Sequence, residues 1–119
     1  MDEVDYLTNE TIFELKEKPK HLMIIGGELI GVELAQAYAL IGSKVTIFEV
    51  SDTILGILDS ECRKIIFKEF DRLAINVITN VNISEVVAHD AQEISLYCGD
   101  KLYQGSNLLI AAGKSAKLT

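Results

Sequence analysis

Hydrophobic positions along the chain change their spacing several times, and each spacing predicts a different element. Residues 21–25 and 44–49 are short apolar or β-branched runs, typical of strands in a parallel sheet. Between them, large apolar residues recur at intervals of four, four and three, which predicts a helix over residues 29–41 that ends at Gly42. The residues expected on the buried face of this helix are Ile30, Leu34, Tyr38 and Ile41.

The same alternation continues through residue 79. Asp59 can cap a second helix that runs to Leu73, and residues 75–79 form a third strand. Strands and helices that alternate through short connections favour right-handed crossovers and a parallel sheet. The apolar face expected for the second helix comprises Cys62, Ile66, Phe70 and Leu73.

Both ends of the chain depart from this alternation. Residues 8–11 offer capping side chains for a short helix over residues 12–16, and Pro19 ends it. Later, three short segments separated by turn residues predict an antiparallel meander, and the apolar run 108–112 predicts a fourth parallel strand. The meander segments are residues 83–89, 93–98 and 101–104.

These elements predict a single α/β domain over the whole chain. Its fold is a Rossmann-like βαβαβ parallel sheet with a three-stranded antiparallel β-meander before the last parallel strand. Residues 1–20 are a lead-in with the short helix, and residues 21–79 form the βαβαβ unit. The meander spans residues 80–105, and residues 106–119 hold the last strand and a C-terminal tail.

Composition narrows the classes of function. The chain has 119 residues, 24% charged and 49% hydrophobic, which is typical of one globular domain. With 11 Lys and Arg against 18 Asp and Glu, the net charge is −7, so neither nucleic acid nor membrane is expected as a partner. The apolar runs are too short to span a bilayer and the acidic start is unlike a signal peptide, so we expect a cytoplasmic protein.

Cysteines and histidines do not suggest a site of their own. Cys62 and Cys98 fit neither a disulfide framework nor a C-x-x-C pair, and both are expected to be packing residues. His21 and His89 have no carboxylate or cysteine at ligand spacing, so no metal site is expected.

The run Gly26-Gly27-Glu28-Leu29-Ile30-Gly31 carries the most specific chemistry. It lies between a predicted strand and a predicted helix, the context of a dinucleotide-binding turn. In that fingerprint the first glycine makes the turn, the second lets the backbone approach a pyrophosphate, and the third lets helix pack on strand. Here the second position is Glu28. A strand-to-helix turn without a ligand is the other interpretation of these glycines.

Glu49 favours the nucleotide interpretation. It ends the second predicted strand, 23 residues after Gly26, where a carboxylate can accept both ribose hydroxyls of adenosine and repel a 2′-phosphate. The residues that follow, Val50-Ser51-Asp52, bring no arginine. We therefore expect NAD rather than NADP.

From Tyr6 to Glu49, and again over Asp59–Val77 and Leu108–Lys114, the sequence resembles the flavin-dependent pyridine nucleotide–disulfide oxidoreductases, nearest to their dihydrolipoamide dehydrogenase and mercuric reductase branch. The resemblance implies one part of such an enzyme, the NAD(H)-binding domain, which positions the nicotinamide for hydride exchange with FAD. It implies an FAD domain and an interface domain elsewhere in a homodimeric parent. The chain alone is then not expected to be catalytic.

The resemblance also implies roles for single residues. Glu49 matches the acid on the adenosine ribose, and Glu33 matches a helix carboxylate near the nicotinamide carboxamide. Leu29 matches a side chain that screens the flavin, and Gly113 matches the glycine after the last strand, at the nicotinamide end. The pyrophosphate loop is matched by Gly26, Gly27 and Gly31.

Glu28 departs from the family pattern. Its carboxylate occupies space where the pyrophosphate approaches, and a like-charge pair at about 4 Å costs roughly 1 kcal/mol in water. We expect weak NAD binding that Glu28→Gly strengthens. Two alternatives stay open: a free-standing module that binds NAD or another adenine nucleotide to regulate a partner, and a scaffold domain without a ligand.

Overall fold

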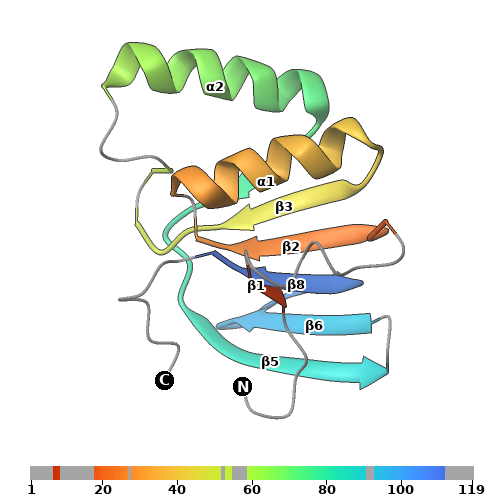
Figure 1. The fold of residues 1–119 in the computed structure, drawn as a ribbon. Helices are drawn as coiled ribbons and strands as arrows, with labels where there is room; N and C mark the ends of the chain where they lie inside the picture. The colour runs from red at the N-terminus through yellow and green to blue at the C-terminus, as the bar shows by residue number, and fades with distance from the viewer. Residues whose placement is uncertain are drawn as a thin grey trace.

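The chain folds into three layers. The computed structural model describes residues 7–8, 18–26, 28–51, 53–54, 59–90 and 93–111. A five-stranded parallel sheet lies between two helices on one face and a three-stranded antiparallel sheet on the other (Figure 1). The predicted mixed α/β fold, with a parallel sheet and a separate meander, is confirmed.

The parallel sheet has the strand order β1-β8-β2-β3-β4. Strand β2 pairs with β3 on one side and with β8 on the other. Successive strands β2, β3 and β4 extend in one direction, whereas β8 lies on the opposite side of β2, so the strand order reverses at β2. The strands are β1 (Leu7–Thr8), β2 (His21–Ile25), β3 (Lys44–Phe48), β4 (Asn76–Ile78) and β8 (Asn107–Ile110).

Two helices connect the strands on one side of β2. Helix α1 (Leu29–Leu40) joins β2 to β3, and α2 (Ser60–Leu73) joins β3 to β4. Asp59 caps α2 as predicted, because its carboxylate accepts a hydrogen bond of 2.9 Å from the backbone N–H of Cys62. At the other end, Ala74 has a φ of 58°, a left-handed conformation that closes the last turn.

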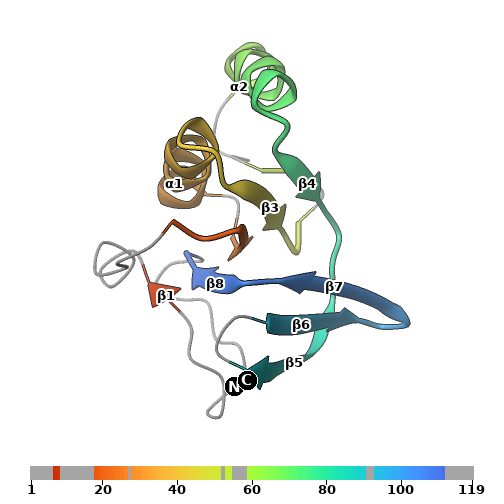
Figure 2. The same cartoon turned by 90° about the vertical axis from the view of Figure 1, so that its right-hand side faces the viewer.

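The antiparallel sheet consists of β5 (Ile83–Asp90), β6 (Glu93–Cys98) and β7 (Lys101–Gly105), paired in that order. Strand β7 leads directly into β8, so the two sheets are continuous at this point (Figure 2). Here a Cβ on Gly105 would lie 2.8 Å from Cγ of Met23, which explains why glycine stands where the chain crosses β2.

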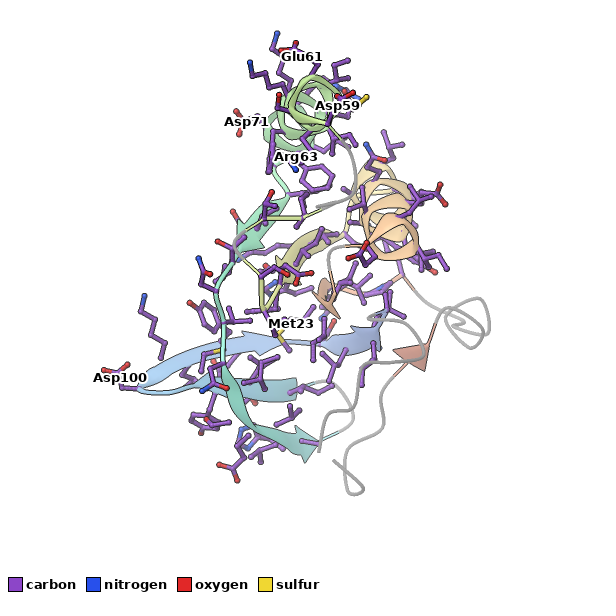
Figure 3. The ribbon with its side chains drawn as sticks, turned by 90° about the vertical axis from the view of Figure 1, so that its left-hand side faces the viewer. Met23, Asp59, Glu61, Arg63, Asp71 and Asp100 are labelled. Atoms are coloured by element: carbon purple, nitrogen blue, oxygen red, sulfur yellow. The ribbon has the colours of Figure 1, made fainter. Side chains whose placement is uncertain are left out.

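Alternate residues of β2 divide between two hydrophobic cores. Leu22 and Ile24 face the helices, whereas Met23 and Ile25 face the antiparallel sheet. Met23 lies between the two sheets (Figure 3). All four side chains are at most 3% exposed. Burial on both faces requires a continuous apolar run, which is why the sequence predicts this strand.

The structure corrects the buried face of α1. Ile30 and Ile41, expected to be buried, are 46% and 58% exposed. The buried residues are Gly31, Val32 and Ala35. Leu34 and Tyr38 are half-buried and pack against the core on the helix side, as predicted. Because α1 is apolar on nearly all sides, its large residues mark only part of the buried face. The small residues Gly31 and Ala35 complete this face, since they allow the helix to lie close to the sheet.

The cysteines and the N-terminal segment also differ in part from what the sequence predicts. Cys62 is exposed in the first turn of α2, so it is not the packing residue that its spacing suggested, whereas Cys98 packs against the core between the sheets. Strand β1 was not predicted, and it pairs Leu7 with Leu109 of β8. The predicted short helix over residues 12–16 lies outside the described residues.

Candidate functional site

Two glycines meet where β2 is followed by α1. Gly26 directly follows β2, is buried, and has a φ of 110°, which L side chains rarely adopt. A Cβ on Gly31 would lie 2.3 Å from the carbonyl oxygen of Gly26. No side chain fits at Gly31 unless the helix moves, so α1 lies directly against the turn that precedes it. The tight turn and the close helix–strand contact expected of these two glycines are both present.

The N-cap residue of α1 does not cap the helix with its own side chain. Glu28 is the N-cap residue, but its exposed side chain makes no capping hydrogen bond, in contrast to Asp59 at α2. No acidic residue stands in the first turn of α1. The φ of Glu28 is −85°, so the backbone at this position does not require glycine. The positive end of the α1 dipole lies at Glu28, just after the turn that Gly26 begins.

Glu49 lies beside this turn. It directly follows β3, and the N–H of Gly26 donates a hydrogen bond of 2.8 Å to the carbonyl oxygen of Phe48. On the other side, the N–H of Ala111, just after β8, donates to Ile25 at 2.9 Å. The ends of three strands thus meet at the carboxyl edge of the sheet, the edge to which the arrowheads of β2 and β3 point (Figure 1).

The carboxylate of Glu49 is held within its own loop. Glu49 is 7% exposed. Its Oε2 accepts hydrogen bonds from the N–H of Ser51 at 2.9 Å and from the Oγ–H of Ser51 at 2.8 Å. Sequence reasoning did not find Ser51, because nothing in the residue pattern shows which way a loop serine points.

The remaining predicted residues are exposed or lie outside the described residues. Leu29, Ile30 and Glu33 are exposed on α1. Gly27 and Gly113 belong to segments that are not described, so their roles stay predictions. The structure therefore brings together the first and third glycines of the turn and the residue that follows β3, Glu49.

A hollow lies on the meander side of the parallel sheet, where residues of β2, β3, β4 and β7 line it. It has a volume of about 420 Å³, and Nε2 of His21 lies 2.9 Å from Oγ1 of Thr46 at its wall. Burial and the neighbouring Lys44 ammonium lower the pKa of His21, although a hydrogen bond to the backbone of Gln104 opposes them. The lining of this hollow holds His21, Lys44 and Tyr103 but, among the described residues, no carboxylate and no cysteine.

The described ranges contain neither a candidate metal site nor a helix that could span a membrane. Within them, His, Cys, Asp and Glu side chains form no group of three that could hold a metal ion. No helix in those ranges is long and apolar enough to cross a membrane.

Comparison with known sequences identifies relatives over nearly the whole chain. The family model described as pyridine nucleotide-disulphide oxidoreductase matches residues 1–119. Mercuric reductase from Bacillus cereus is 34% identical over 117 residues, which are 96% of this chain and 18% of that protein. Dihydrolipoyl dehydrogenase from Acholeplasma laidlawii is 33% identical over 110 residues, which are 92% of this chain and 32% of that protein.

Comparison with solved structures agrees. The HOCl-induced flavoprotein disulfide reductase RclA from Escherichia coli matches with a TM-score of 0.86 at 29% identity, over 96% of this chain and 26% of that one. The chain therefore spans less than a third of the length of each of these relatives. It belongs to the pyridine nucleotide–disulphide oxidoreductase family.

Proposed function

We propose that this chain is the NAD(H)-binding domain of a flavin-dependent disulfide oxidoreductase and positions the nicotinamide for hydride exchange with FAD held elsewhere in the parent. The observation that carries this proposal is the meeting of Gly26, Gly31 and Glu49 at the carboxyl edge of the parallel sheet. In open α/β sheets, ligands bind at this edge, where the strand order reverses. The reversal at β2 supports a Rossmann-like nucleotide site.

The turn before α1 suits a pyrophosphate. The positive φ of Gly26 and the missing side chain at Gly31 keep the turn tight, and the positive end of the α1 dipole lies just after it. A negative charge at an exposed helix N-terminus is stabilised by about 0.3–1 kcal/mol. The Glu28 carboxylate opposes binding of the pyrophosphate, because it adds a negative charge at the N-cap. Binding is therefore expected to be weak.

Glu49 suits the adenosine ribose. A carboxylate there accepts hydrogen bonds from both ribose hydroxyls and repels a 2′-phosphate. Neither Val50 nor Ser51 carries a positive charge. NAD, when bound, supplies the nicotinamide that accepts or gives a hydride, while residues of this chain bind and orient it. Glu33, exposed on α1, is the residue proposed to face the carboxamide.

A regulatory module that binds an adenine nucleotide is the second candidate. Glu28 favours it, because a ligand with fewer phosphates suffers less repulsion at the N-cap of α1. Such a module would bind AMP at least as tightly as NADH. A nicotinamide-positioning domain would prefer NADH.

Calorimetry with NADH, NADPH and AMP tests the proposal. We expect NADH to bind more tightly than NADPH. Glu49→Gln should weaken NADH binding and so reduce the ratio of NADH affinity to NADPH affinity. Glu85→Gln is the matched control, because it removes the same charge from an exposed position on β5. Absence of NADH binding, or equal effects of the two substitutions, would refute the proposal, and tighter binding of AMP would favour the regulatory module.

A further inference from the structure

We infer that Ser51 is a positioning residue that holds the Glu49 carboxylate for the adenosine ribose and so sets the preference for NADH over NADPH. This inference rests on the nucleotide-binding function proposed above. It concerns a side chain that stands two residues beyond the ribose-binding acid.

Ser51 donates two hydrogen bonds to Glu49. Both the N–H and the Oγ–H of Ser51 donate to the same oxygen, Oε2 of Glu49, at 2.9 and 2.8 Å. Hydrogen bonds to a carboxylate are stronger than those between neutral groups, and Glu49 is only 7% exposed, so water competes little for them. Two donors on one oxygen restrict the torsions of the side chain and fix the direction of the carboxylate.

The backbone that carries Ser51 is itself anchored. Its carbonyl oxygen accepts a hydrogen bond of 2.9 Å from the N–H of Asn80, in the loop after β4. Glu49 is held on both sides as well, since its N–H donates to Ile78 at 2.9 Å and its carbonyl oxygen accepts from Val81 at 3.2 Å. Asn80 has a φ of 56°, a left-handed conformation that asparagine tolerates. Because these bonds involve only the backbone, removal of the Ser51 hydroxyl should leave the loop in place.

A fixed carboxylate has opposite effects on the two nucleotides. The ribose diol of NADH finds its acceptor already oriented, so less conformational freedom is lost on binding. The 2′-phosphate of NADPH meets a negative charge that cannot swing away without losing the two Ser51 bonds. Without the hydroxyl, one of the two Ser51 donors is lost and the carboxylate is held less firmly in this direction.

Calorimetry on Ser51→Ala and Ser51→Thr tests this role. Ser51→Ala should weaken NADH binding about three- to tenfold and change NADPH binding less, so that the NADH preference falls. Ser51→Thr keeps the hydroxyl at an exposed position and should restore the preference. Ser84→Ala is the matched control, because it removes an exposed serine hydroxyl that bonds a backbone carbonyl in the meander.

The outcomes separate this inference from the proposed function. If the unaltered chain binds no NADH, the proposed function fails, and the role of Ser51 fails with it. If the unaltered chain binds NADH but Ser51→Ala leaves the ratio of NADH to NADPH affinity unchanged, only the role of Ser51 is overturned. A loss of both affinities by the same factor, or a loss that Ser51→Thr does not restore, also overturns it.

Discussion

Gly31→Ala should destabilise the chain, even though alanine is the better helix former. In a helix interior, alanine is ordinarily more stable than glycine by roughly 0.5–1 kcal/mol. Here the new Cβ would lie 2.3 Å from the carbonyl oxygen of Gly26, about 0.7 Å inside the 3.0 Å limit that real Cβ contacts respect. Helix α1 must move away from β2, which also loosens the packing of Val32 and Ala35. Overpacking of this kind costs about 1–3 kcal/mol.

After the gain in helix propensity is subtracted, the middle of the two ranges gives an expected loss of about 1 kcal/mol, or roughly 4–8 °C in Tm. Thermal unfolding followed by circular dichroism measures it, and calorimetry should show NADH affinity reduced by about tenfold or more, because the turn at Gly26 moves with the helix. Ala37→Gly, at an exposed position of the same helix, is the control. It should cost roughly 1 kcal/mol through propensity without changing NADH affinity. A Gly31→Ala chain as stable as the unaltered one would refute the steric reasoning.

Three further outcomes are expected. Glu28→Gly and Glu28→Gln should both tighten NADH binding about two- to tenfold at low salt, because each removes an exposed like charge; calorimetric affinities equal to that of the unaltered chain would contradict this. His21 has a folded-state pKa below its ordinary 6.5, so its neutral form stabilises the fold above that pH, and this contribution is lost as the pH falls toward the folded-state pKa. The free energy of unfolding in urea should therefore decline with acid more steeply than in His21→Gln, and parallel profiles would refute the linkage. Asp59→Ala should lower Tm at neutral pH, because it removes the cap on the Cys62 N–H. That hydrogen bond lowers the pKa of Asp59, so the difference in Tm should vanish once acid protonates the carboxylate; a difference that persists in acid would contradict this.

The order of the central elements could be predicted because burial leaves a clear pattern. Strand β2 is covered on both faces from Leu22 to Ile25, and those four residues are all apolar. Strand β1 could not be predicted, since Leu7–Thr8 is held by pairing with β8 from the other end of the sequence and has no periodicity of its own. Half of the buried face of α1 was misjudged for a related reason, since Ile30 and Ile41 are exposed. What decides it is the close approach to the sheet at Gly31 and Ala35, which depends on tertiary structure.

Part of the candidate site could also be predicted. Gly26, Gly31 and Glu49 stand at spacings that a strand–helix–strand unit converts into proximity, and the structure brings them together. The support for Glu49 could not be predicted. It depends on the path of two loops, one carrying Ser51 and the other Asn80, and hydrogen bonds between loops leave no period in a sequence.

The position of β2 at the centre of the sheet has a consequence for synthesis of the chain. Its pairing with β3 can form early. Its other edge stays unpaired until β8 is synthesised, some 85 residues later in the sequence. At ordinary translation rates, that edge stays open for roughly 4–17 s. An apolar strand with an unpaired edge is a template for aggregation. Nascent chains that stop short of Asn107 should therefore be the ones that chaperones hold most tightly.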